Sequence, residues 1–206
     1  MLEVLDLLAT VVFAATGALA ASRKGMDLLG FLWLGAAAGV GGGTLRDLIL
    51  DQPVFWTVNT TPLIASLVAA AAMHFIAPRF PSRLQVLIWL DAFGMAFAST
   101  AGTLKCLGVE GSGLVAVVMG VFTASAGGII RDLLAQEPSI ILRRDIYVTA
   151  AALGSIVVVV AMHLGLSELH SGGLGFLSAS ALRCVAIRLG LQLPVYRGRP
   201  PSGGES

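Results

Sequence analysis

Seven apolar stretches follow one another along this chain, with short polar connections between them. A helix needs about 20 residues to cross the roughly 30 Å of hydrocarbon in a bilayer, and helices satisfy their own backbone hydrogen bonds there. Hydrophobic residues make up 56% of the 206 residues and charged residues only 12%, so the chain is more apolar than a water-soluble domain. The sequence therefore predicts an all-α membrane protein with seven transmembrane helices, over residues 2–21, 28–50, 62–77, 84–104, 114–134, 146–164 and 174–189.

The sequence offers no motif for enzyme chemistry. Its two cysteines, Cys106 and Cys184, lie far apart, without the CxxC or Cys/His spacing of a metal site. A Ser-His-Asp set, an HExxH helix and a nucleotide-binding glycine loop are all missing in their required context. We therefore expect no enzyme activity and no cofactor, and we expect no nucleic acid partner.

The chain carries an internal repeat with an offset of 85 residues. "GGGTLRDLILDQPVFW", which begins at Gly41, aligns without a gap to "AGGIIRDLLAQEPSII", and Asp6 aligns to Asp91. Each repeat contains three predicted crossings, and an odd number makes the second copy run through the membrane in the opposite sense. We expect an inverted repeat in one transmembrane domain over 1–193: repeat one at about 3–78, repeat two at about 84–164 and a seventh helix at about 172–190, followed by a mobile cytoplasmic tail at 194–206.

Basic residues predict the orientation. With the amino terminus outside, eleven of the thirteen Lys and Arg residues fall on the inner side, and only Arg46 and Lys105 fall on the outer side. Cytoplasmic loops of membrane proteins carry the excess of Lys and Arg. The bias predicts an amino terminus outside and a carboxyl terminus, with Arg143 and Arg144, in the cytoplasm.

Glycines interrupt the second and fifth apolar stretches at equivalent places, namely Gly41, Gly42 and Gly43 and then Gly127 and Gly128. Glycine costs about 1 kcal/mol relative to alanine inside a helix, so we expect kinks there. Inverted repeats usually place their pathway between such discontinuous helices. Close packing of helices through small residues is the alternative.

An Arg-Asp pair follows each glycine group, Arg46 with Asp47 and Arg131 with Asp132. Adjacent residues on a helix point about 100° apart, so we expect each arginine to find its partner on another helix. Asp6 and Asp91, each within an apolar stretch, are the predicted acceptors. Snorkelling of the arginines to the membrane surface is the alternative. The other polar residues that we expect along an ion pathway are Thr44, Ser99, Lys105, Thr123 and Ser125.

The paired "GGGTLRD" and "AGGIIRD" blocks, in two inverted three-helix units plus a seventh helix, resemble the prokaryotic branch of the trimeric intracellular cation (TRIC) channels, or UPF0126 family. The resemblance covers about residues 3–190. It implies a homotrimer in a prokaryotic inner membrane, with a pore in each subunit formed by the kinked second and fifth helices with the first and fourth. It also implies permeation of monovalent cations, chiefly potassium.

One departure from the family is visible. Animal members carry a Lys-Glu-Val motif associated with phosphoinositide lipid, whereas this chain reads "PSRLQVL" at that place. We expect membrane lipids around the protein, but the resemblance does not imply regulation by that lipid. Three functions stay open from the residues: a potassium-permeable channel, a secondary carrier of a small zwitterion such as glycine, and an enzyme or purely structural membrane protein.

Overall fold

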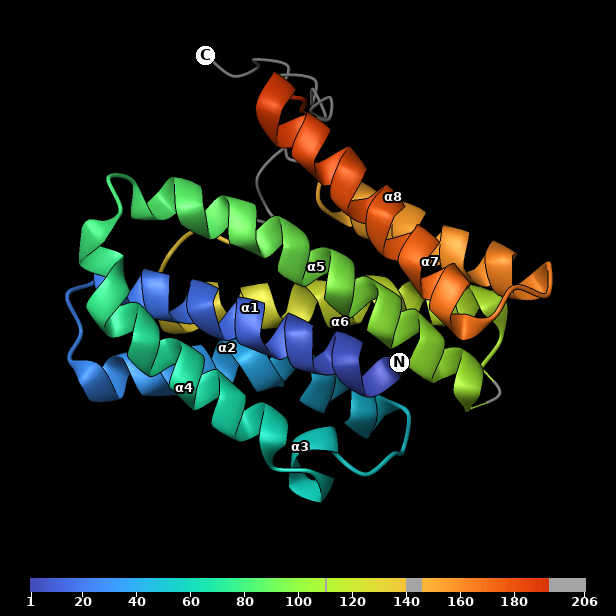
Figure 1. The fold of residues 1–206 in the computed structure, drawn as a ribbon, viewed down its shortest axis with the longest axis horizontal. Coiled ribbons are helices and arrows are strands. Elements are labelled where there is room, and N and C mark those ends of the chain that lie inside the picture. Colours follow the sequence, from blue (N-terminus) through green and yellow to red (C-terminus); the bar gives the residue numbers. More distant parts are fainter. Residues whose placement is uncertain (110, 140–145, 193–206) are drawn as a thin grey trace, which may run out of the picture.

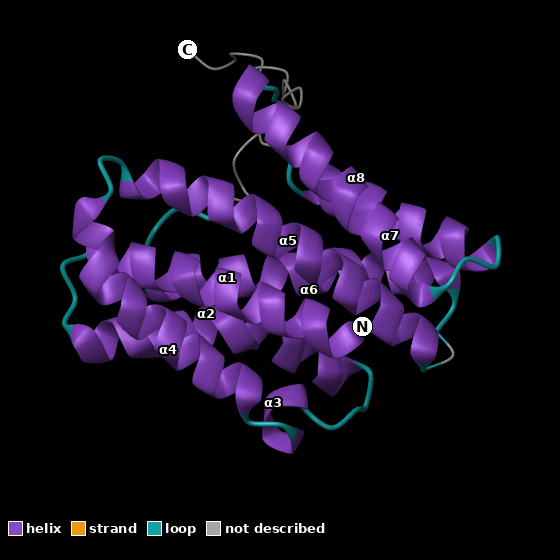
Figure 2. Cartoon of the chain, viewed as in Figure 1, coloured by secondary structure: helices purple, strands orange, loops and turns teal. Residues whose placement is uncertain are grey.

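The computed structural model describes residues 1–109, 111–139 and 146–192, and the secondary structure of this part is helical (Figure 2). Arg143, Arg144 and the predicted tail at 194–206 lie outside the described residues. The helices are α1 (Leu2–Arg23), α2 (Leu28–Ile49), α3 (Phe55–Val58), α4 (Thr61–Ile76) with a 3-10 turn η1 (Ala77–Arg79), α5 (Arg83–Gly108), α6 (Gly113–Leu134), α7 (Val148–His163) and α8 (Glu168–Leu189).

Six helical segments are long and apolar enough to cross a membrane, which accords with the predicted fold class. The exception among the seven predicted crossings is α7, an apolar helix of 16 residues. It begins after Tyr147, whose side chain makes no capping hydrogen bond, and it ends before Leu164. Helix α8 begins earlier than expected, since the Ser167 hydroxyl caps it by accepting a hydrogen bond from the His170 backbone N–H.

The helices form two three-helix units in opposite orientation. Helices α1, α2 and α4 pack on one another, and α5, α6 and α7 do the same. The units join where α1 packs on α5 and α2 packs on α6, and α8 lies against α5 and α7 (Figure 1). This is the inverted repeat with an additional helix that the sequence predicts.

Glycines set the distance between the two units at the crossing of α2 and α6. A Cβ atom placed on Gly42 would lie 2.6 Å from the carbonyl oxygen of Thr123, and one on Gly127 would lie 2.8 Å from that of Ala38. Because Thr123 and Ala38 are themselves repeat mates, the two contacts are related by the pseudo-twofold axis of the repeat. Only glycine permits backbones to approach so closely.

The same glycines do not interrupt their helices. Helical structure continues through Gly41, Gly42 and Gly43 in α2 and through Gly127 and Gly128 in α6. The contacts support the packing alternative for these residues, and a bend within an uninterrupted helix stays a prediction.

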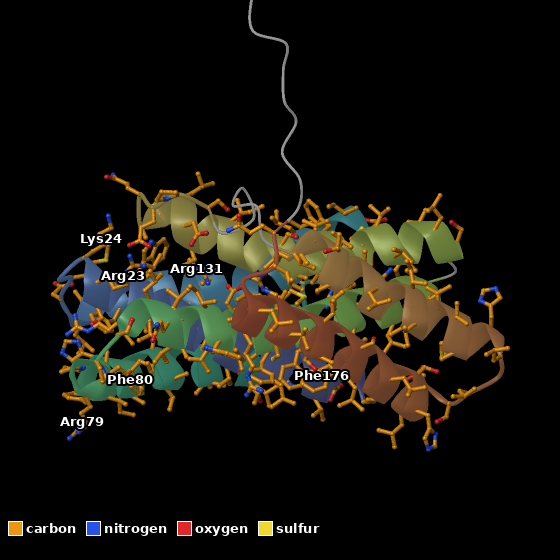
Figure 3. The ribbon with its side chains drawn as sticks, turned by 90° about the horizontal axis from the view of Figure 1, so that it is seen from above. Arg23, Lys24, Arg79, Phe80, Arg131 and Phe176 are labelled. Carbon is orange, nitrogen blue, oxygen red and sulfur yellow. The ribbon has the colours of Figure 1, made fainter. Side chains whose placement is uncertain are left out.

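Three basic residues gather at one end of the bundle. Arg23, Lys24 and Arg79 lie together at one end (Figure 3). At that end the Arg23 guanidinium pairs with the Glu137 carboxylate at 2.8 Å and so ties α1 to the segment after α6. Lys105 lies at the other end, beside Leu2 and Asn59. This separation agrees with the predicted orientation, which itself stays a prediction.

Candidate functional site: two buried charge clusters and a cavity

The first charged cluster joins α1, the end of α2 and α5. The fully buried Arg46 guanidinium donates from Nη1 and Nη2 to the two carboxylate oxygens of Asp6, at 2.5 and 3.1 Å. Its Nε donates to Asp47 Oδ1 at 2.7 Å, and Lys105 Nζ lies 2.7 Å from the same oxygen. We call Asp6, Arg46, Asp47 and Lys105 cluster one.

Asp6 is the interhelical partner that the sequence predicts for Arg46. Arg46 also pairs with its neighbour in the chain, because Nε, close to the backbone, reaches Asp47 while the terminal nitrogens extend to α1. Two positive and two negative groups balance in cluster one, which offsets the cost of burying each charge.

Cluster one also holds α3 in place. Asp47 Oδ2 accepts a hydrogen bond from the Phe55 backbone N–H at 2.9 Å, and the Phe55 ring centre lies 5.7 Å from the Arg46 Cζ. The Trp56 indole N–H donates to the Thr44 hydroxyl at 2.8 Å. Helix α3, which the sequence did not indicate, is therefore fastened to the end of α2 that carries the Arg-Asp motif.

The second cluster repeats this arrangement with differences. Arg131 donates from Nε to Asp132 Oδ1 at 2.9 Å and from Nη1 to Asp91 Oδ1 at 2.5 Å, as its repeat mate does. The same Nη1 also donates to the Thr16 hydroxyl at 3.0 Å. We call Thr16, Asp91, Arg131 and Asp132 cluster two. Because Thr16 belongs to α1, cluster two joins the two repeats.

The pairing of Arg131 with Asp91 uses one oxygen instead of two. Within the described part of the chain, Asp91 Oδ2 and Arg131 Nη2 are buried without a hydrogen-bond partner. Tyr147, also buried, donates its hydroxyl to the Ala124 carbonyl at 3.0 Å, and its ring centre lies 5.3 Å from the Arg183 Cζ. Thr16 and Tyr147 were not predicted as site residues, because no sequence motif marks either one and the repeat mate of Thr16 is Ala101.

A cavity of about 450 Å³ lies against cluster one. We call it the α3-side cavity, and its lining residues are Leu2, Glu3, Val4, Asp6, Leu7, Pro53, Phe55, Val58, Asn59, Thr61, Pro62 and Lys105. Asp6 and Phe55 also line a second space of about 10 Å³, between the two repeats, together with Phe13, Gly42 and Thr123. A cavity needs roughly 10–15 Å³ to hold one water molecule, so this second space, which we call the constriction, holds at most one.

The remaining predicted residues divide into those near the constriction and those away from it. Gly43 packs on the Phe55 ring, whereas Gly41 packs on the Ile130 side chain. Gly128 lies beside the polar groups of Asp91, Arg131 and Tyr147.

Three of the predicted hydroxyls are turned toward their own helices. Thr44, Ser99 and Thr123 donate to the carbonyls of Val40, Ala96 and Met119, at 2.7, 3.1 and 2.7 Å. Thr123 lines the constriction. Ser125, the fourth predicted hydroxyl, is 8% exposed and lines neither the constriction nor the α3-side cavity. Among the described residues no group of three or more His, Cys, Asp or Glu side chains is arranged to hold a metal ion.

Comparison with known proteins finds relatives over most of the chain. A family model described as "Glycine transporter" matches the chain twice, over residues 3–78 and 88–163. The UPF0126 inner membrane protein YadS of Escherichia coli (strain K12) is 41% identical over 93% of this chain and 94% of its own length. A UPF0126 membrane protein of Deinococcus radiodurans is 39% identical over 94% of this chain and 91% of its own.

Solved structures show the same similarity. The crystal structure of the TRIC trimeric intracellular cation channel orthologue from Rhodobacter sphaeroides is 42% identical, with a TM-score of 0.89 over 92% of this chain and 98% of that chain. A second TRIC cation channel structure is 31% identical, with a TM-score of 0.84 over 96% of this chain and 98% of that one. These neighbours are described as channels, not as enzymes.

Proposed function

The chain belongs to the prokaryotic TRIC channel family, also called UPF0126, and from that premise we propose that it is a potassium-permeable channel for monovalent cations. One pore runs through each subunit of a homotrimer in the inner membrane. Its relatives include an inner membrane protein and channels described as trimeric. Sodium is a second candidate permeant ion.

The observation that carries this proposal is the position of Asp6. Asp6 lines both the α3-side cavity and the constriction, so a cation that enters the cavity meets a carboxylate at the point where the route narrows. The route continues along the crossing of α2 and α6 toward cluster two, where Asp91 lies. Carboxylates lower the energy of a cation in a space with little water, as acidic rings do in other cation channels.

In this proposal each arginine has a structural or gating role and is not a ligand of the permeant cation. A fixed positive charge repels a permeant cation unless carboxylates neutralise it, and Arg46 and Arg131 are each paired with two aspartates. The constriction has room for at most one water molecule, so conduction requires the groups around Gly42, Phe55 and Thr123 to move apart.

The proposed orientation places the α3-side cavity outside the cell. It rests on the basic end of the bundle formed by Arg23, Lys24 and Arg79, which belongs in the cytoplasm. Single cysteines introduced at Thr57 and Ser202 test it. A membrane-impermeant thiol reagent should label Thr57→Cys alone from outside, and equal labelling of both would refute the orientation.

A secondary carrier of a small zwitterion is the second candidate. The description of the matching family model as a glycine transporter favours it. The α3-side cavity also offers a carboxylate, Asp6, and an ammonium, Lys105, for the two ends of such a molecule.

Reconstitution of the purified protein in a planar bilayer with a potassium gradient separates the candidates. A channel gives unitary currents that reverse near the potassium equilibrium potential, whereas a carrier gives slow, saturable glycine uptake without unitary currents. The Arg46→Ala variant should change conductance or open probability while remaining trimeric in cross-linking. If the unitary currents of Arg46→Ala were identical to those of the parent, Arg46 would have no role in the ion pathway.

A further inference from the structure

We propose that Lys105 is a tethered cation that limits the entry of permeant ions at the α3-side cavity. The inference rests on the proposed channel function and deepens it by assigning a residue that sets conductance. It comes from the contacts of Lys105, from its exposure and from the way the two repeats differ.

The Lys105 ammonium occupies the place beside Asp47 where a permeant cation entering from the cavity would be stabilised. Its Nζ lies 2.7 Å from Asp47 Oδ1, and the Asp47 side chain is fully buried. The Lys105 side chain is 15% exposed and lines the same cavity as Asp6 and Glu3. A monovalent cation in the cavity therefore meets a site already filled by a positive charge of the protein.

Lys105 decides the net charge at the inner end of this cavity. With Lys105, cluster one holds two positive and two negative groups, and without it the sum becomes minus one. A unit charge about 10 Å from an ion changes the local ion concentration about twofold in water, and more where the surroundings are apolar. Removal of the charge should therefore increase cation entry.

The comparison of the repeats argues that Lys105 is not needed to hold the Arg-Asp motif together. Its repeat mate is Ala20, a buried small residue on α1. In cluster two, Arg131 pairs with both of its aspartates and with the uncharged Thr16 hydroxyl, although the position equivalent to Lys105 carries no charge. In cluster one the two hydrogen bonds from Arg46 to Asp6 fix the arginine independently of Lys105.

Lys105 lies close to the carboxyl end of α5, in repeat two, and pairs with Asp47 of repeat one. It thus carries charge from repeat two into the cluster of repeat one.

The test is the unitary potassium conductance of the full trimer in a planar bilayer, recorded at low and high salt. The variant Lys105→Gln should conduct about two to ten times more than the parent at about 20 mM KCl. The difference should shrink at about 1 M KCl, where the Debye length is only about 3 Å. Lys105→Arg should behave as the parent does, because it keeps the charge.

The matched control is the chain's other lysine. Lys24 lies at the opposite end of the bundle, where its Nζ donates to the Gln136 carbonyl at 3.5 Å, so Lys24→Gln should leave the conductance unchanged. Equal conductance of Lys105→Gln and the parent at low salt overturns the inference. A parent that carries no unitary current at all instead overturns the proposed channel function.

A second measurement does not depend on how well Lys105→Gln folds. Lys105→Cys, in a background with Cys106 and Cys184 changed to alanine, is treated in the bilayer with small charged thiol reagents from the cavity side. An ammonium-bearing reagent should lower the current of the open channel and a sulfonate-bearing reagent should raise it. Reagent effects that do not depend on the sign of the charge overturn the inference.

Discussion

The substitution Gly42→Ala tests whether the glycines of the repeated motif act by close packing. Its new methyl group would lie 2.6 Å from the carbonyl oxygen of Thr123 and 3.2 Å from the backbone nitrogen of Gly127. Both atoms belong to the backbone of α6, so neither can rotate aside. The two repeats must therefore move apart at the crossing of α2 and α6.

The magnitude follows from a comparison with Gly128→Ala, the matched control. Around Gly128 the nearest atoms to an added Cβ are Asp91 Oδ1 at 3.6 Å, Arg131 Nη2 at 3.7 Å and the Tyr147 hydroxyl at 3.8 Å, all ordinary contacts. Both substitutions lie in helix interiors, so the gain of about 1 kcal/mol in helix propensity is common to them and cancels. What remains is the overpacking cost at Gly42, about 1–3 kcal/mol.

Thermal unfolding in detergent, followed by circular dichroism, measures this difference. For chains of 150–250 residues, 1 kcal/mol shifts Tm by about 2–4 °C. Gly42→Ala should therefore melt about 2–12 °C below Gly128→Ala, and Gly128→Ala should melt at or above the parent. If the two variants melt together, or if Gly128→Ala is the less stable, the assignment of Gly42 to the crossing is refuted.

Two further outcomes follow from the clusters and the helix ends. Asp91→Asn removes a charged partner from the buried Arg131 and should cost about 3–5 kcal/mol of unfolding free energy, read from the same melting curves; an unchanged Tm would show that Asp132 alone suffices. Gln136→Gly should stabilise the protein by about 1 kcal/mol, because Gln136 holds a left-handed backbone conformation with φ of 51° at the end of α6, where glycine is favoured. A lower Tm for that variant would mean that the Gln136 side chain has a role of its own.

Much of this protein is determined by its sequence alone. Hydropathy along the chain identifies the membrane helices, because the bilayer demands about 20 apolar residues per crossing whatever lies nearby. The offset between repeats identifies the inverted architecture. It also identifies Asp6 and Asp91 as partners of the arginines, since each is a carboxylate within an apolar helix and the two are repeat mates. These are properties of single helices and of their order, and a sequence carries both.

The tertiary structure decides which faces of the helices meet, and this cannot be read from the helices one at a time. Helical structure continues through Gly42 and Gly127, and their role at the crossing is visible only because Thr123 and Ala38 lie opposite them. Thr16 reaches Arg131 across 115 positions of the chain, and Lys105 of repeat two reaches Asp47 of repeat one. Partner choice depends on the close packing of backbones in three dimensions. A difference of one residue in helix rotation, about 100°, would change every one of these pairs.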